Sequence, residues 1–148
     1  MPNIRSYTSA DREACLEIVS LIHPDDVEVE ALASRELACS LDEKQWLIPG
    51  VLVLEEGDSV VAFGAYTPSP YDMDGWGLSW IYVHPAFQGR GFGKRMTRAL
   101  LESIRAKNGA SAYVLLTCKA QLIPFYEACG FCVLMDRGER CLMGQELV

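Results

Sequence analysis

The sequence lacks any hydrophobic run near the ~20 residues that a membrane-spanning helix needs. Its first residues also lack the apolar stretch of a secretory signal, so we expect a cytoplasmic protein without membrane contact. Basic residues are in the minority, since 13 Lys and Arg stand against 20 Asp and Glu, for a formal net charge of -7. Because nucleic-acid binding depends on clustered Lys and Arg, this balance argues against DNA or RNA as a partner.

Histidine is scarce, and the two histidines are His23 and His84. Six cysteines are present, but they are scattered over hydrophobic segments, which is typical of reduced core thiols. Only Cys129 and Cys132 have the spacing of a C-x-x-C motif. A structural zinc site needs four ligands, and the sequence offers no second pair at useful spacing, so we expect neither a metal nor a redox role.

The chain of 148 residues, half of them hydrophobic, predicts a single domain over 1–148 with a substantial core. Hydrophobic periodicity and turn residues predict the order β-α-α-β-β-β-α-β-α-β-β, which is typical of a mixed α/β domain. The clearest hairpin turns at Glu56-Gly57-Asp58. Asn108-Gly109 is expected to close the helix that follows the glycine-rich stretch.

Three glycines alternate in the stretch "QGRGFGK", residues 88–94, between a predicted strand and a predicted helix. Unpaired amides at a helix start favour an anion, and glycines let phosphate oxygens approach the backbone closely. Arg90, Lys94 and Arg95 add positive charge, so the pattern predicts a phosphate or pyrophosphate site. A P-loop would need Ser or Thr where Arg95 stands. A dinucleotide site would need wider glycine spacing and an acidic ribose ligand.

The stretch from Gln88 to Gly93 resembles the Gln/Arg-x-x-Gly-x-Gly/Ala signature of the GNAT acyl-CoA N-acyltransferases. The preceding "WIYVHP" is similar to that family's fourth strand, and "PFYEACGF", residues 124–131, resembles its second signature. The element order also fits. The resemblance implies a mixed, mostly antiparallel sheet of about seven strands with four flanking helices. It also implies an N-acetyltransferase that uses acetyl-CoA as co-substrate and no metal.

The resemblance assigns roles to the residues at matching positions. The backbone of Ile81, Tyr82 and Val83 would pair with the pantetheine arm and supply an oxyanion donor. Tyr126 would protonate the departing thiolate. The pyrophosphate would be surrounded by Gln88, Gly89, Arg90, Gly91, Phe92, Gly93 and Lys94.

The general base is where the sequence departs from the family. Several relatives carry Glu or His at the positions of Gly77 and Ser79, and neither of these is a base at neutral pH. Asp72 and Asp74 in the preceding loop, or waters leading to solvent, are the alternatives for removing the amine's proton. Direct attack in a ternary complex needs no covalent intermediate, so the absence of a Ser-His-Asp arrangement carries no weight.

Two stretches resemble the arylalkylamine N-acetyltransferase branch, "LLTCKAQLIPFYEACGF" and "IHPDDVEVEALASRELA", although His23 replaces the aromatic residue before the proline. This resemblance favours a small aromatic or hydrophobic primary amine as the acceptor. The expected substrate contacts are His23, Tyr66, Trp80, Asp72 and Asp74. Acetylation of a protein or peptide amine, a non-catalytic coenzyme A sensor, and a homodimer all stay open.

Overall fold

The computed structural model describes residues 2–42, 44, 49–108 and 111–147. Within these ranges one seven-stranded sheet of order β1-β2-β3-β4-β5-β7-β6 is flanked by four α-helices. The strands are β1 Asn3–Ser6, β2 Gly50–Glu56, β3 Ser59–Pro68, β4 Gly75–Val83, β5 Tyr113–Lys119, β6 Cys132–Asp136 and β7 Arg140–Glu146. The helices are α1 Arg12–Ile22, α2 Val27–Cys39, α3 Phe92–Asn108 and α4 Ile123–Glu127, with short 3-10 turns η1 Ser9–Asp11, η2 Pro85–Phe87 and η3 Ala120–Leu122.

The strand pairing confirms the predicted element order and the predicted mixed, mostly antiparallel sheet. Only β4 and β5 are parallel neighbours, and the other neighbouring pairs of described strands are antiparallel. The predicted hairpin turns at Gly57, whose φ of +63° is a conformation that glycine adopts without steric cost. Asn108 ends α3 as expected, whereas Gly109 lies outside the described residues.

Side-chain caps explain where the first two helices begin. The Asp11 carboxylate accepts a hydrogen bond from the Thr8 backbone amide at 2.8 Å, at the start of the turn that leads into α1. The Asp26 carboxylate accepts from the Val29 amide at 3.1 Å and caps α2. These hydrogen bonds satisfy backbone amides that have no partner within a helix. They therefore set the residues at which the turn into α1 and the helix α2 begin.

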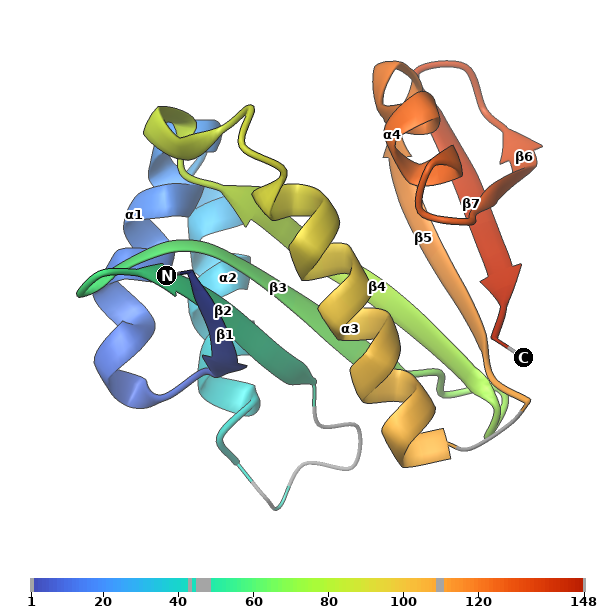
Figure 1. The fold of residues 1–148 in the computed structure, drawn as a ribbon, viewed down its shortest axis with the longest axis horizontal. Coiled ribbons are helices and arrows are strands. Elements are labelled where there is room, and N and C mark those ends of the chain that lie inside the picture. Colours follow the sequence, from blue (N-terminus) through green and yellow to red (C-terminus); the bar gives the residue numbers. More distant parts are fainter. Residues whose placement is uncertain (1, 43, 45–48, 109–110, 148) are drawn as a thin grey trace.

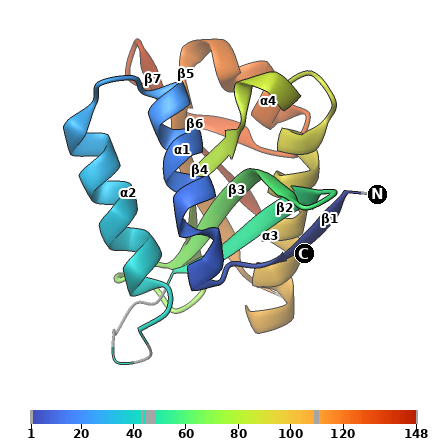
Figure 2. The same ribbon diagram turned by 90° about the vertical axis from the view of Figure 1, so that its left-hand side faces the viewer.

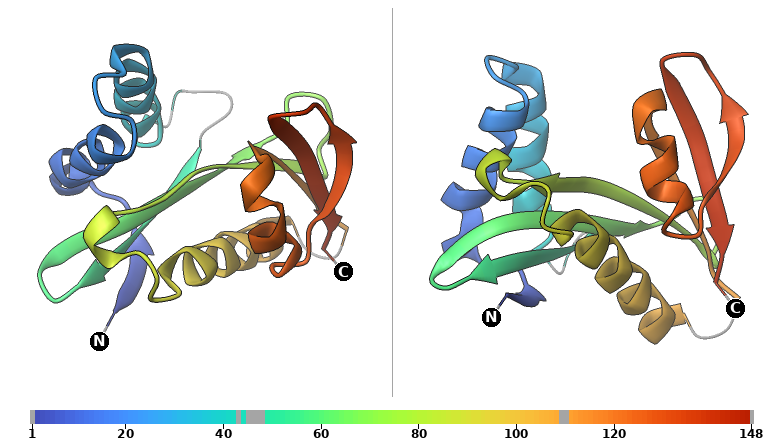
Figure 3. Two further views of the ribbon diagram at one scale, coloured as in Figure 1. Left: turned by 90° about the horizontal axis from the view of Figure 1, so that it is seen from above. Right: turned by 45° about the horizontal axis from the view of Figure 1, so that its top comes forward.

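Helices cover both faces of the sheet. α1 and α2 run side by side over one face, and α3 lies on the other face (Figures 2 and 3). The core is divided in the same way. Phe63 is buried in the cluster beneath α1 and α2, whereas Met96, Leu100 and Ile104 of α3 are buried in the cluster on the opposite face. Removal of these apolar side chains from water is the main force that holds the layers together.

The sheet opens between β4 and β5. These strands pair only where Gly75–Gly77 meets Tyr113–Leu115, and they diverge beyond that point (Figure 1). β4 continues to Val83 paired with β3 alone, and β5 continues to Lys119 paired with β7 alone. The two strand edges that face each other therefore have backbone groups with no partner strand, and they form the walls of an opening.

Trp80 interrupts the regular pleat of β4. Its φ is +56°, a left-handed value that is rare for a bulky residue. The pairing register shifts between Phe63 and Ala65 of β3, so Trp80 and Ile81 lie together opposite Gly64. Two residues opposite one is the definition of a β-bulge, a feature that is frequent beside active sites.

The bulge places an additional side chain on the face of α1 and α2. Leu78, Ile81 and Val83 pack into the core cluster of α3, whereas Trp80 and Tyr82 pack into the cluster beneath α1. Because side chains alternate along a strand, the residue after Leu78 also faces α1. The consecutive residues Ser79 and Trp80 therefore both face α1.

Candidate active site

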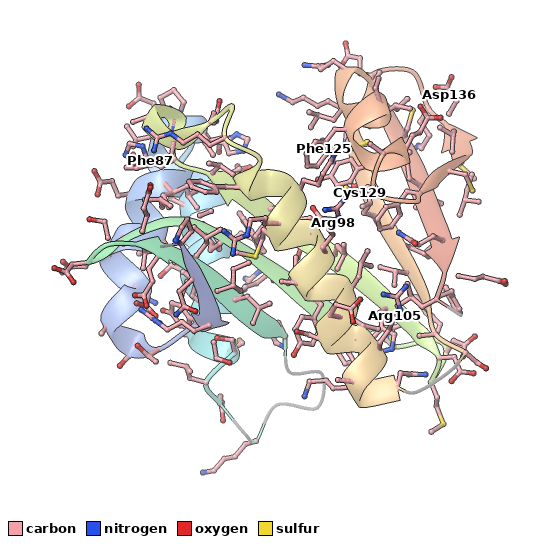
Figure 4. The ribbon with its side chains drawn as sticks, viewed as in Figure 1. Phe87, Arg98, Arg105, Phe125, Cys129 and Asp136 are labelled. Atoms are coloured by element: carbon pink, nitrogen blue, oxygen red, sulfur yellow. The ribbon has the colours of Figure 1, made fainter. Side chains whose placement is uncertain are left out.

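A cleft of about 730 Å³ occupies the opening between β4 and β5. Its lining comes from the end of α1, the second half of β4, η2 with the glycine-rich loop, β5, α4 and the first residue of β7. Figure 4 shows Phe87 at the η2 side and Phe125 on α4, and both line this cleft. Segments from both halves of the sequence therefore meet at one place.

The lining residues divide between the two faces of the sheet. Leu116 and Cys118 of β5 belong to the core cluster of α3, so the alternating Thr117 and Lys119 face the other way. What we call the α3 side is formed by the glycine-rich loop, Ile81, Val83, Leu116, Cys118 and Tyr126. What we call the α1 side is formed by His23, Ser79, Trp80, Tyr82, Thr117, Lys119 and Arg140.

The glycine-rich loop, residues 88–94, leads into the first turn of α3. Gly89 and Gly91 both have φ of +82°, and a Cβ at either position would meet no atom within 4 Å. Their conformation requires glycine, and the open space beside them admits a group that approaches the backbone. The Gly91 carbonyl accepts from the Arg95 amide at 3.1 Å, so the loop delivers the chain into a helix start, where an anion is favoured.

All but one of the residues expected to bind the co-substrate line the cleft, and the exception among the described residues is Arg90. Its guanidinium lies 3.4 Å from the Glu56 carboxylate and 5.0 Å from the ring centroid of Phe87. Gln88 lines the cleft and donates from Nε2 to the Val83 carbonyl at 3.1 Å. The expected set is thus brought together, with Arg90 on its outer surface.

The backbone of β4 offers polar groups to the cleft beyond the bulge. The His84 amide donates to a carbonyl of β3 at 2.8 Å, so Tyr82, two residues earlier, also directs its backbone toward β3. The backbone groups of Ile81 and Val83 then point away from β3 and into the cleft. An amide held in this way can stabilise negative charge that develops on an oxygen.

Tyr126 of α4 lines the α3 side with only 8% of its surface exposed. Its ring packs edge-to-face against Phe125 and Phe131, with centroids 4.9 and 5.9 Å away. Burial raises the pKa of Tyr126 to about 12, with smaller contributions from the neighbouring Cys118 and Cys129, so the hydroxyl stays protonated at neutral pH. No described residue hydrogen-bonds to this hydroxyl, which leaves it available to a group in the cleft.

His23 and two aromatic side chains form one wall of the α1 side. His23 Nε2 lies 2.7 Å from the Tyr82 hydroxyl oxygen. The Trp80 indole N–H donates to the Glu36 carboxylate of α2, and the Trp80 ring packs edge-to-face on Tyr82 with centroids 5.8 Å apart. Burial is the main cause that raises the pKa of Tyr82, so this hydroxyl is also neutral at neutral pH.

Three residues expected near the acceptor lie elsewhere. Tyr66 is 7% exposed and packs within the core cluster of α3. Asp72 accepts from the Tyr113 hydroxyl at 3.2 Å, and Asp74 accepts from the Asn108 side chain at 3.3 Å. These contacts hold the β3–β4 loop at the end of the sheet where β4 and β5 are still paired. The structure therefore does not bring Tyr66, Asp72 or Asp74 into the cleft.

The opposite wall of the α1 side was missed by sequence reasoning. Arg140 donates from Nη2 to Thr117 Oγ1 at 3.0 Å, and Lys119 pairs directly with Arg140 in the β5–β7 ladder. The one hint in the sequence was that Arg140 lies in the predicted final hairpin. Strand pairing between β5 and β7 joins distant segments, however, and no local pattern shows which residue will lie opposite Lys119.

The six cysteines are free. Cys132 is exposed, and its thiol contacts the Gly144 carbonyl, whereas the pKa of Cys129 is raised mainly by burial. In the part of the chain that the structure describes, no group of three or more His, Cys, Asp or Glu side chains is placed to hold a metal ion. Over the same residues, no helix has the length and apolar character to cross a membrane.

Residues 49–133 match the family model of the acetyltransferase (GNAT) domain, which covers more than half of the chain and includes the glycine-rich loop and Tyr126. The chain belongs to the GNAT family. The match confirms the resemblance and the prediction of an acetyltransferase. Comparison with curated protein sequences gives no match.

Solved structures share the GNAT fold over nearly the whole chain. A GNAT-family protein from Desulfovibrio desulfuricans has a TM-score of 0.79 at 17% identity, with 100% of both chains covered. The PaiA N-acetyltransferase from Thermoplasma acidophilum, solved with coenzyme A, has a TM-score of 0.77 at 16% identity, with 99% of both chains covered. The ribosomal-protein alanine N-acetyltransferase from Escherichia coli has a TM-score of 0.76 at 20% identity and covers 99% of this chain and 94% of its own.

Proposed function

We propose that this GNAT acetyltransferase moves an acetyl group from acetyl-CoA to the primary amine of a small molecule with an aromatic or hydrophobic body. The observation that carries the proposal is the cleft between β4 and β5, which joins the glycine-rich loop on one face to an aromatic wall on the other. The PaiA enzyme was solved with coenzyme A, and its similar fold supports the same co-substrate here.

The residues of the α3 side fit coenzyme A. Gly89 and Gly91 leave open space beside the start of α3, and Lys94 adds positive charge, as phosphate groups require. Ile81 and Val83 present backbone groups along which an amide-bearing chain can pair as an added strand. When bound, acetyl-CoA supplies an activated acetyl group on a sulfur leaving group.

Two groups of the chain stabilise the charges of the transfer. A backbone amide of Ile81 or Val83 donates to the carbonyl oxygen as negative charge builds there. The Tyr126 hydroxyl donates a hydrogen bond to the departing sulfur. A phenol with a pKa of about 12 holds its proton more tightly than a thiol, whose ordinary pKa is ~8.5. Hydrogen bonding therefore accounts for the role of Tyr126 better than complete proton transfer.

The acceptor amine must attack uncharged, so its proton needs an acceptor near the cleft. Histidine is the side chain that most often serves as a general base in enzymes, and His23 is the one histidine among the described residues that line the cleft. Asp72 and Asp74 are engaged in the β3–β4 loop outside it. His23 therefore takes the amine's proton, directly or through a water molecule.

Steady-state acetylation of a panel of amines tests the proposal. We expect turnover with small aromatic amines such as tyramine and phenethylamine, and binding of acetyl-CoA by isothermal titration. Faster turnover of short peptides through their amino groups would contradict the small-molecule acceptor. Binding of acetyl-CoA without turnover of any amine would contradict the enzymatic function and favour a sensor.

A further inference from the structure

Two cations stand side by side on the α1 side of the cleft. Lys119 ends β5, Arg140 begins β7, and the two residues are direct partners in the antiparallel ladder. Arg140 donates from Nη2 to Thr117 Oγ1 at 3.0 Å, which holds the guanidinium along the β5 wall. Both cations line the cleft and both are exposed to solvent within it.

The charged Lys and Arg side chains that line the cleft are not balanced by any Asp or Glu in its described lining. Among the described residues, the cleft is lined by Lys94, Lys119 and Arg140 and by no Asp or Glu, although the chain has a net charge of -7. No described carboxylate lies within ion-pair distance of Lys119 or Arg140. Like charges opposite each other on neighbouring strands destabilise a sheet. No described carboxylate therefore offsets the repulsion between these two cations.

The positive charge of Arg140 acts electrostatically on Tyr82, which lies on the opposite wall of the α1 side. It opposes the rise in the pKa of Tyr82 that burial causes. The Tyr82 hydroxyl in turn contacts His23 at 2.7 Å. Arg140 thus lines the same cleft as the His23–Tyr82 pair, where we propose that the amine loses its proton, whereas Lys94 belongs to the glycine-rich loop.

We propose that Arg140, with Lys119 beside it, binds a carboxylate carried by the acceptor, so that the substrate class is an amine with an acid group, such as an aromatic amino acid. The inference rests on the proposed acetyltransferase function. A planar guanidinium binds a carboxylate through two parallel hydrogen bonds, which also fixes the orientation of the bound molecule. The transfer itself is unchanged: the N–C bond forms, the C–S bond breaks, the amine's proton passes to His23, and the thiolate leaves.

Three amines with nearly the same body test this assignment: L-phenylalanine, its methyl ester and phenethylamine. The parent enzyme is expected to have a KM for L-phenylalanine at least about tenfold below those of the other two. Arg140→Gln should raise that KM by about tenfold or more and leave the KM for phenethylamine within about twofold. Arg137→Gln is the matched control, since Arg137 lies in the same hairpin but outside the cleft lining.

Two kinetic outcomes would overturn the anion site. One is a parent enzyme that handles the ester or phenethylamine as well as the free acid. The other is an Arg140→Gln variant that raises the KM of all three amines alike. A thermal melt of each variant confirms that it is folded.

A binding measurement separates this inference from the proposed function. N-acetyl-L-phenylalanine is titrated into the protein saturated with coenzyme A, and no turnover is needed. We expect binding to Arg140→Gln at least about tenfold weaker than to the parent or to Arg137→Gln. Equal binding to all three proteins would overturn the carboxylate site. If no amine is acetylated, the proposed function fails, and this titration still decides the role of Arg140.

Discussion

The Nε2 atom of His23 lies 2.7 Å from the hydroxyl oxygen of Tyr82, although the two residues are 59 positions apart in the chain. This contact joins the end of α1 to β4 beside the bulge at Trp80. His84, the other histidine, has a structural role, because its Nδ1 accepts a hydrogen bond from the Ala86 amide at 3.0 Å and caps η2. Substitution of each histidine in turn therefore separates chemistry in the cleft from local structure.

His23→Ala should lower kcat/KM for a good amine by about 100-fold or more, because it removes a positioned proton acceptor. The affinity for acetyl-CoA should stay nearly unchanged, since His23 lies on the α1 side. Steady-state kinetics and isothermal titration provide the two measurements.

Added imidazole should restore part of the lost rate in His23→Ala, which a histidine with only a packing role would not allow. His84→Ala is the control and should keep kcat/KM within a few-fold of the parent. A His23→Ala variant with the parent rate would show that water alone removes the proton.

Gly91→Ala should weaken coenzyme A binding by at least tenfold, about 1.4 kcal/mol. The reason is that an alanine strains the loop at φ of +82° and fills the open space beside its amides. Gly57→Ala is matched to it, since Gly57 has φ of +63° and also has open space around it, but lies in the β2–β3 turn. Both variants should lose ~1–2 kcal/mol of stability in denaturant. Equal coenzyme A affinity of the two folded variants would contradict the phosphate site.

Tyr126→Phe should lower turnover 10- to 1000-fold, about 1.4 to 4 kcal/mol in the barrier, with acetyl-CoA affinity nearly unchanged. Tyr66→Phe removes a hydroxyl from a tyrosine buried outside the cleft and should leave kinetics as they are. If Tyr126→Phe turns over at the parent rate, its hydroxyl takes no part in the departure of the sulfur.

The raised pKa of Tyr126 also predicts a pH dependence. Because burial raises this pKa to about 12, the neutral donor form predominates at every lower pH, and it is lost only as the pH approaches that value. Ionisation of Tyr126 should therefore cause no loss of kcat between pH 8 and pH 10. A decline over this range that is absent in Tyr126→Phe would be the opposing result.

Asp72→Asn and Asp74→Asn should each change kcat/KM by less than about threefold, since neither carboxylate reaches the cleft. Their hydrogen bonds to Tyr113 and Asn108 predict instead a small loss of thermal stability. A thousandfold loss of kcat with stability intact would restore these residues as candidate bases.

Asp11 should stabilise the fold most at neutral pH. Its carboxylate accepts hydrogen bonds from Arg5 at 2.7 and 2.8 Å, and this pairing, aided by the Thr8 amide, holds the pKa of Asp11 below its ordinary value of 3.8. A carboxyl whose pKa is lowered in the folded state contributes stability above its unfolded pKa, and that stability is lost as the pH falls through the folded pKa.

Asp11→Asn is expected to reduce the free energy of unfolding by about 1–3 kcal/mol at pH 7, and by less at an acid pH, because the parent carboxyl is progressively protonated as the pH falls through its lowered pKa. Urea denaturation at the two pH values measures the difference. Asp58→Asn, in the exposed β2–β3 turn, is the control and should change little. A pH-independent loss would mean that the charge of Asp11 plays no part.

The sequence predicts those parts of the molecule that depend on local chemistry. The hairpin at Gly57 follows from turn residues between apolar runs, and the start of α3 follows from the glycines before it. The bulge at Trp80, the contact of His23 with Tyr82 and the pairing of Lys119 with Arg140 were not predicted. Each depends on segments that only the folded sheet brings together, and nothing near these residues in the sequence specifies their partners.

The bulge in β4 has a consequence for how the specificity of this cleft can evolve. Ser79 faces α1 and Ile81 faces α3, so these two residues would still alternate between the faces of the sheet if Trp80 were deleted. The additional residue of the bulge therefore does not change the face that either neighbour takes. Gain or loss of one codon here therefore adds or removes one aromatic side chain of the α1 side, while the other residues of β4 keep their faces. Acceptor range in such a sheet can change by insertion or deletion as well as by substitution.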